Sequence, residues 1–192
     1  WNMFKTIPSY NFLPVDSDLE TWNMDFNYLN ESEYLKDNVG LLAVHNIGNI
    51  INIPKFKIKN PKMVVVEDNC EGFLGFYGGR PSGTASLAHS ISFFGNKTLT
   101  SGEGGAFCTD DEDIYNEMNR VRAHGITSEK FVFDGLGYNY RMTNVQAALL
   151  YGQLESLQEI MELKNLIFEY YRKELTGIPG LHFQKSEYDT IN

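Results

Sequence analysis

Short apolar runs alternate with longer stretches of helical periodicity along this chain. Such alternation is typical of βαβ units, which build a mostly parallel sheet. The runs that predict strands are 11–15, 40–44, 63–67, 91–94 and 106–108. The run at 63–67 is almost entirely apolar, and this predicts a strand buried on both faces. We therefore expect an α/β fold with a mostly parallel sheet.

Two capping-box patterns mark the expected starts of helices. In a capping box the first and fourth residues each bond the backbone amide of the other. Thr109 begins the first pattern, and its helix is expected to run to about Ala123. Thr143 begins the second, and the apolar periodicity continues to Leu175. That long helix would measure about 45 Å at 1.5 Å per residue.

The length of the chain bounds its domain organisation. Its 192 residues suit one large domain, or one domain and part of another. A helix of that length exceeds what one compact domain usually needs, so it predicts a link to a second domain. We expect residues 1–175 to form a partial large domain that includes the long helix. Residues 176–192 are expected to start a small carboxyl-terminal domain, most of which is missing.

Charge and composition exclude several classes of function. The formal net charge of -9 would repel a phosphate backbone, so no nucleic-acid partner is expected. No apolar run approaches the roughly 20 residues that span a bilayer. Cys70 and Cys108 show no disulfide or zinc spacing, which fits a reducing cytoplasm. The four histidines lack metal-ligand spacing, and His45 is expected to be a hydrogen-bonded loop residue.

Two features point to chemistry. Glu67, Asp68 and Asn69 end a predicted strand, where ligands of open α/β sheets bind, although a solvated turn is the alternative. Lys97 lies between an apolar strand and a glycine-rich turn. Desolvation there would lower the pKa of the lysine and free its amine to attack an aldehyde. The alternative is a surface lysine in a loop.

Four motifs favour the chemical interpretation. They read EDNCEG at 67–72, SFFGNKT at 92–98, GEGG at 102–105 and GYNYRMTN at 137–144. In order and approximate spacing they resemble the DegT/DnrJ/EryC1/StrS sugar aminotransferases, over about residues 10–179. The resemblance implies part of the three-layer αβα large domain of fold-type I enzymes, which use pyridoxal 5'-phosphate.

The resemblance also implies a role for five residues. Lys97 corresponds to the catalytic lysine that binds the cofactor's aldehyde and later moves a proton. Asp68 corresponds to the carboxylate that keeps the pyridine nitrogen protonated. Glu71 would lie near the cofactor's 3'-oxygen, where many relatives have glutamine, and its protonation state is open. Ser92 would bond the phosphate, with a plain strand serine as the alternative. Asn139 would reach the phosphate from a neighbouring subunit.

The implied activity is transfer of an amino group, with glutamate as the expected donor, to a nucleotide-linked keto sugar. Because Asn139 would come from a partner, a homodimer with a shared active site is implied. SFFGNKT and Glu71 most resemble the branch that aminates C4 of a GDP-linked 4-keto-6-deoxy sugar, giving an amino sugar for surface polysaccharide or glycan synthesis. Sugar 3-dehydrases of this family have histidine in place of the lysine, so Lys97 favours transamination.

Two other interpretations remain open. The family's Gly-Thr phosphate cradle and the aromatic that stacks on the cofactor are expected to precede Trp1, outside this chain. A non-catalytic remnant or binding protein that retains the fold is therefore the alternative. A flavodoxin-like or Rossmann domain has little support, because no GxGxxG follows a predicted strand.

Overall fold

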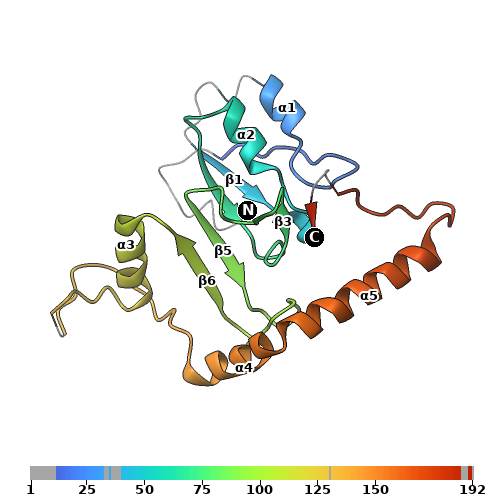
Figure 1. Cartoon of the computed structure of the whole chain (residues 1–192). Coiled ribbons are helices and arrows are strands. Elements are labelled where there is room, and N and C mark those ends of the chain that lie inside the picture. Colours follow the sequence, from blue (N-terminus) through green and yellow to red (C-terminus); the bar gives the residue numbers. More distant parts are fainter. Residues whose placement is uncertain (1–11, 33–34, 36–39, 130, 187–189, 192) are drawn as a thin grey trace.

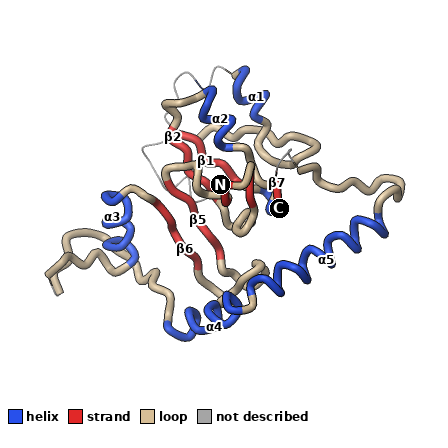
Figure 2. The backbone as a smooth tube through the Cα atoms, viewed as in Figure 1, coloured by secondary structure: helices blue, strands red, loops and turns tan. Residues whose placement is uncertain are grey.

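The computed structural model describes residues 12–32, 35, 40–129, 131–186 and 190–191. Its centre is a four-stranded sheet in the order β1-β2-β5-β6 (Figures 1 and 2). β1, β2 and β5 are parallel, and β6 is antiparallel to β5. The four strands are β1 (Gly40–Val44), β2 (Val64–Asp68), β5 (Ala88–Ser92) and β6 (Gly105–Thr109). The predicted α/β fold with a mostly parallel sheet is confirmed.

One face of β1 and β2 is covered by two short helices, α1 (Phe26–Glu31) and α2 (Ile53–Lys59). Asn52 caps α2 by accepting a hydrogen bond from the Lys55 amide at 2.9 Å. The buried side chains of this core come from the two strands, the two helices and the segments beside them. They include Leu29, Ala43, Ile51, Ile53, Phe56, Met63 and Val65.

The other face of the same strands is open within the described part of the chain. Val64 is 45% exposed, whereas Val65 and Glu67 are buried. The prediction that the strand at 63–67 is buried on both faces is therefore wrong for Val64. Neighbouring strand residues point to opposite faces, and the helices described here cover only one of them.

Two strand predictions need correction. The strand predicted at 91–94 is β5, which begins at Ala88 and ends at Ser92. Its polar residues hid its start, but the ladders to β2 and β6 form through the backbone. The strand predicted at 11–15 is wrong for residues 12–15, which form no strand. Asn11 lies outside the described residues. Pro14, within that run, has no amide to donate to a ladder.

Helix α3 (Glu112–Arg122) packs against β6 and ends where the sequence predicts, with Ala123 as its carboxyl-terminal cap. Its amino-terminal cap is Asp111, not Thr109, because Asp111 accepts from the Ile114 amide at 2.9 Å. Thr109 instead ends β6, and its hydroxyl donates to the Leu87 carbonyl at 2.8 Å. The acidic start stabilises the helix by opposing its dipole.

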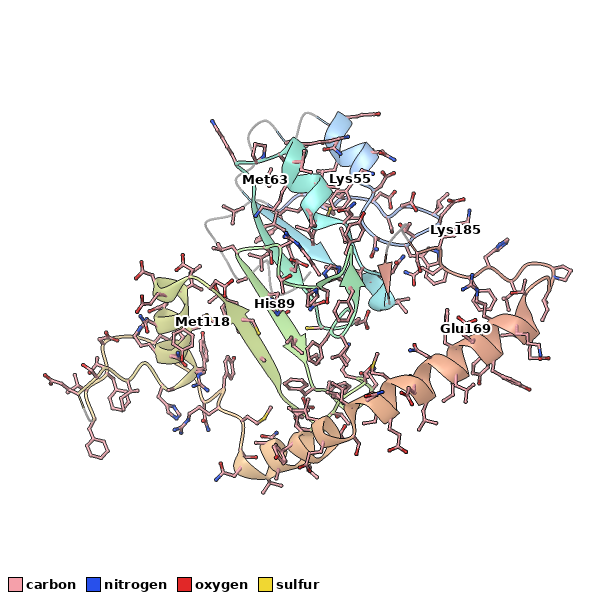
Figure 3. The ribbon with its side chains drawn as sticks, in the orientation of Figure 1. Lys55, Met63, His89, Met118, Glu169 and Lys185 are labelled. Carbon is pink, nitrogen blue, oxygen red and sulfur yellow. The ribbon has the colours of Figure 1, made fainter. Side chains whose placement is uncertain are left out.

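The predicted long helix is two helices in line, α4 (Asn144–Glu155) and α5 (Leu157–Leu175). The capping box at Thr143 and the end at Leu175 are confirmed. The prediction of one continuous helix is wrong. Ser156, at φ -106° and ψ 17°, departs from helical geometry and separates the two helices. The pair forms one rod along the lower edge of the molecule in Figure 1. No described residue of α5 is buried, and side chains such as Glu169 project from it (Figure 3).

The remaining elements bring the end of the chain back to β1. A one-turn helix, η3 (Asn46–Gly48), follows β1, and a small sheet joins β3 (Phe76–Tyr77), β4 (Arg80–Pro81) and β7 (Thr190–Ile191). After α5, the Lys185 amide donates to the Glu20 carbonyl at 2.8 Å. Among the described helices, none is long and apolar enough to cross a membrane.

A glutamine on α4 fixes the loop that follows Lys97. Gln153 accepts from the Thr100 amide at 2.9 Å and donates to the Thr100 carbonyl at 2.6 Å. Beside these two hydrogen bonds, Leu150 packs in a second core cluster with Ile91, Phe93 and Leu99. Helix α4 thereby anchors the turn between β5 and β6.

Replacing Gln153 by Ala is expected to lower the free energy of unfolding by about 2 kcal/mol, because two half-buried hydrogen bonds are lost. Urea denaturation measures the change. The matched control is Gln158→Ala on α5, an exposed glutamine that donates to Glu162 at 2.9 Å, which should change stability by less than about 0.5 kcal/mol. Equal losses in both variants would contradict the anchoring role.

Candidate active site

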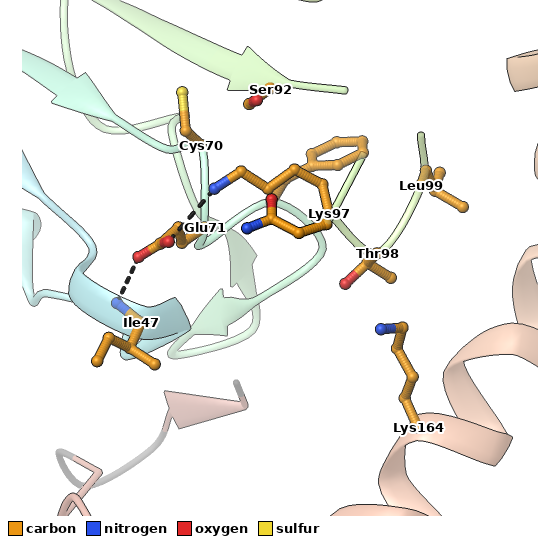
Figure 4. A pocket seen from close by; sticks show the side chains of 10 residues that line it. Ile47, Cys70, Glu71, Ser92, Lys97, Thr98, Leu99 and Lys164 are labelled. Atoms are coloured by element: carbon orange, nitrogen blue, oxygen red, sulfur yellow. Dashed lines mark hydrogen bonds and ion pairs between the residues drawn. The ribbon is translucent and has the colours of Figure 1, made fainter. Parts of the chain in front are cut away.

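A pocket of about 380 Å³ lies beyond the carboxyl ends of β1, β2 and β5 (Figure 4). This is the edge of the sheet where the sequence predicts a ligand site. The lining comes from the turns after these strands and from α5. It consists of Ile47, Cys70, Glu71, Phe73, Ser92, Asn96, Lys97, Thr98, Leu99 and Lys164.

The structure brings Lys97 and Glu71 together in this pocket. The Lys97 Nζ lies 3.3 Å from Glu71 Oε1, and the lysine side chain is only 18% exposed. The second carboxylate oxygen, Oε2, accepts from the Ile47 amide at 2.8 Å. Figure 4 shows both contacts. The alternative of a solvated loop lysine does not fit this placement, because the amine points into the pocket and is held there.

Ser92 and Asp68 lie on neighbouring parallel strands. Ser92 ends β5 and lines the pocket, and its hydroxyl accepts from the Phe94 amide at 3.3 Å. Asp68 ends β2 and accepts from the Cys70 amide at 3.1 Å. Asp68 is not among the lining residues, but Cys70 is. The aspartate therefore adjoins a lining residue at the end of β2.

Asn139 lies on a different part of the chain from Lys97. It pairs with Ala123 beyond the end of α3, it is exposed, and it is not among the lining residues. The preceding Gly137 has no room for a Cβ, because the backbone of Gly125 lies against it. Within the single described chain, Asn139 and Lys97 are thus not brought together.

Just before the turns that line the pocket, His45 and Glu67 form a buried pair. His45 Nε2 lies 2.7 Å from Glu67 Oε2, and the side chains are 0% and 2% exposed. The Ile51 amide donates to His45 Nδ1 at 3.0 Å, so the imidazole proton lies on Nε2 and is donated to Glu67. His45 is confirmed as a hydrogen-bonded residue. The solvated-turn alternative for residues 67–69 is wrong, because Glu67 and Asn69 are buried.

The pKa of Glu67 reflects competing effects. Burial raises it, but hydrogen bonds from His45, Ser86 and the Gly83 amide outweigh burial and bring the pKa below its ordinary value. The Gly83 amide donates to Oε2 at 3.0 Å. Glu67 is therefore ionised at neutral pH and ties the end of β2 to the loop before β5.

Cys70 adjoins this site as a neutral thiol. Its Sγ lies 3.3 Å from Ser90 Oγ. Burial, together with the nearby Asp68, raises the pKa of the thiol. Both cysteines, Cys70 and Cys108, are free. A raised pKa disfavours the reactive thiolate. We therefore regard Cys70 as a residue that lines the pocket and not as a nucleophile.

Several lining residues carried no sequence signal. Lys164 belongs to the periodic pattern of α5, which indicates an ordinary solvated helix lysine, yet Figure 4 shows it facing the pocket across from Thr98. Ile47 is a lone apolar residue in a polar turn. Only the folded arrangement places these side chains at the site. Within the described part of the chain, no group of three or more His, Cys, Asp or Glu side chains could hold a metal ion.

The fold is that of a family of aminotransferases. The model of the DegT/DnrJ/EryC1/StrS aminotransferase family matches residues 9–190, and the chain belongs to this family. It is 32% identical over 176 residues to the GDP-perosamine synthase of Escherichia coli O157:H7, covering 90% of this chain and 48% of that protein. It is 34% identical to the GDP-perosamine synthase of Caulobacter vibrioides, covering 85% and 45%.

Solved structures agree with this membership. The E. coli GDP-4-keto-6-deoxy-D-mannose-3-dehydratase with bound hydrated PLP superposes with a TM-score of 0.81 at 28% identity. That match covers 90% of this chain and 49% of the solved one. The same enzyme class with a trapped PLP-glutamate geminal diamine gives a TM-score of 0.82 at 28% identity. The chain spans about half the length of the curated relatives it matches.

Replacing Glu67 by Ala is expected to lower the free energy of unfolding by about 3 kcal/mol at neutral pH, because the His45 and Gly83 donors lose a buried acceptor. The folded pKa of Glu67 lies below the ordinary 4.5. The contribution of Glu67 to folding stability is therefore complete above pH 4.5, and it is lost as the pH falls through the folded pKa.

Urea unfolding as a function of pH tests this linkage. Glu67→Gln keeps an acceptor of the same shape but removes the charge, so the loss of stability on acidification should become shallower. The control is Glu20→Gln, which alters an exposed carboxylate paired with Lys185 and should leave that slope almost unchanged. An unaltered slope in Glu67→Gln would show that Glu67 is not the titrating group.

Proposed function

We propose that this chain is part of a pyridoxal 5'-phosphate-dependent aminotransferase that converts the keto group of a GDP-linked 4-keto-6-deoxy sugar to an amine, with glutamate as donor. The observation that carries the proposal is the Lys97 amine, held 3.3 Å from Glu71 inside a pocket at the carboxyl edge of the sheet. The relatives named GDP-perosamine synthase support the sugar, and the neighbour named with PLP-glutamate supports the donor.

The residues of the pocket fit this cofactor. The volume of about 380 Å³ falls in the range of roughly 300–1,000 Å³ typical of small-molecule sites. The side chains supply a primary amine, a hydroxyl and a carboxylate, which are the groups needed for an aldehyde, a phosphate and a ring hydroxyl. When bound, pyridoxal phosphate supplies an aldehyde that condenses with amines and a ring that accepts electrons.

Each residue contributes its own chemistry. Lys97 would bind the aldehyde and carry the proton between donor, cofactor and sugar, and Glu71 would orient that amine. The Ser92 hydroxyl accepts from the Phe94 amide, so its own proton is available to a phosphate oxygen. Asp68, at the end of β2, would keep a ring nitrogen protonated.

Labelling of Lys97 tests the proposal. Pyridoxal phosphate followed by borohydride should leave a covalent label on the peptide that contains Lys97, detected by peptide mass mapping. Lys97→Arg should abolish that label, because a guanidinium forms no stable imine under these conditions. The control Lys55→Arg alters an exposed lysine of α2 and should keep it. Absence of the label from the unaltered protein would favour the non-catalytic alternative.

We also propose a homodimer with a shared site. Helices α4 and α5 carry many apolar side chains that are more than half exposed, a pattern typical of an interface. They are Val145, Leu149, Tyr151, Leu163, Leu166, Ile167, Phe168, Tyr170 and Tyr171. Asn139 is exposed on the loop before α4, where it is available to a partner's pocket. A second copy of the chain would cover the apolar surface, and its pocket would bind Asn139.

Mixing two inactive variants tests the shared site. Lys97→Ala and Asn139→Ala should each be impaired alone, but exchanged subunits give heterodimers with one intact site. About a quarter of the wild-type activity should then return, because half the dimers are mixed and one of their two sites is whole. No recovery after demonstrated subunit exchange would mean that Asn139 serves its own subunit.

Two further assignments belong to the same proposal. Residues 1–175 would form part of the cofactor-binding large domain, and residues 176–192, which follow α5, would begin a small domain. The free thiols of Cys70 and Cys108 suit a reducing compartment, so we place the enzyme in the cytoplasm.

A further inference from the structure

Ile47 has an unusual backbone conformation. Its φ of +54° and ψ of 33° lie in the left-handed region, which a β-branched residue rarely adopts. Its side chain is 63% exposed, so burial in a core does not compensate for the conformation. Strained residues of this kind persist where the surroundings impose them, and they cluster at ligand sites.

The surroundings of Ile47 impose its conformation from both sides. Its amide donates to Glu71 Oε2 at 2.8 Å. The adjacent turn is held by His45, which is bonded to Glu67 in the interior. Gly72 packs so closely on His45 that an added Cβ would lie 2.7 Å from the histidine Cβ. The turns after β1 and β2 are thus locked together.

Ile47, in this locked turn, lines the pocket. One carboxylate, that of Glu71, contacts both the Ile47 amide and the Lys97 amine. Figure 4 shows the Glu71 carboxylate between the Ile47 amide and the Lys97 amine, so the isoleucine lines the pocket beside the carboxylate expected near the cofactor's 3'-oxygen. Much of the remaining rim, including Asn96, Thr98 and Lys164, is polar.

We propose that Ile47 is a cofactor-binding residue whose aliphatic side chain packs against the nonpolar surface of the pyridine ring bound at Lys97. This inference rests on the proposed function. Covering an exposed aliphatic side chain removes apolar area from water, and this gain offsets the strain of the left-handed backbone. Stability in the free protein is thereby exchanged for ligand binding.

The test uses a residue that accepts the conformation but lacks the apolar side chain. Asparagine adopts left-handed geometry readily and keeps the amide that donates to Glu71. Ile47→Asn should lower the unfolding equilibrium constant about fivefold while raising the dissociation constant for pyridoxal phosphate about tenfold. Urea denaturation of the free protein and absorbance titration with pyridoxal phosphate measure the two effects.

Two variants complete the experiment. Ile47→Leu keeps an aliphatic side chain and should bind pyridoxal phosphate within about threefold of the unaltered protein. Ile58→Asn is the matched control, because it makes the same substitution at an isoleucine that is 81% exposed on α2 and does not line the pocket. It should leave the dissociation constant unchanged.

The direction of the two effects decides the outcome. Greater stability with weaker binding supports the contact, because a purely structural role would move both measurements the same way. Binding by Ile47→Asn as tight as by Ile58→Asn would overturn it, as would a joint loss of stability and binding. Failure of the proposed function appears separately: the unaltered protein would take no label at Lys97, and the inference would fall with it.

Discussion

The site depends on the carboxylate of Glu71, which joins the turns that follow three parallel strands. Ile47 comes after β1, Glu71 after β2 and Lys97 after β5, and the carboxylate contacts both of the others. Parallel strands place their carboxyl ends at one edge, so these distant turns meet there. The Glu71 side chain thereby sets the position of the Lys97 amine and of the strained residue Ile47.

A second acidic residue, Glu67, lies four residues before Glu71. Glu67 is buried, and a buried carboxylate is tolerated only when hydrogen bonds replace the water it has lost. His45 and the Gly83 amide provide such bonds. Because Glu67 and Glu71 lie on the same short segment, satisfying the buried charge also restricts where the second carboxylate can point. Burial energetics and site geometry are coupled through this segment.

Elements with a strong local signal were predictable, and those shaped by distant partners were not. The strand at 40–44 and the capping box at Thr143 follow from apolar runs and capping residues. The start of β5 was missed because its residues are polar and its pairing comes from strands far along the chain. The exposed Val64 was missed for a related reason: an apolar run cannot reveal whether both faces of a strand are covered.

By itself, the sequence determined the α/β class, the family motifs in their order and the candidate residues Asp68, Glu71, Ser92, Lys97 and Asn139. Motif chemistry is local, so a short stretch is enough to carry it. The tertiary structure alone decided that Glu71 meets Lys97 and that Ile47 and Lys164 line the same pocket. These contacts join residues tens of positions apart, and they exist only when sheet pairing and burial bring the turns to one edge.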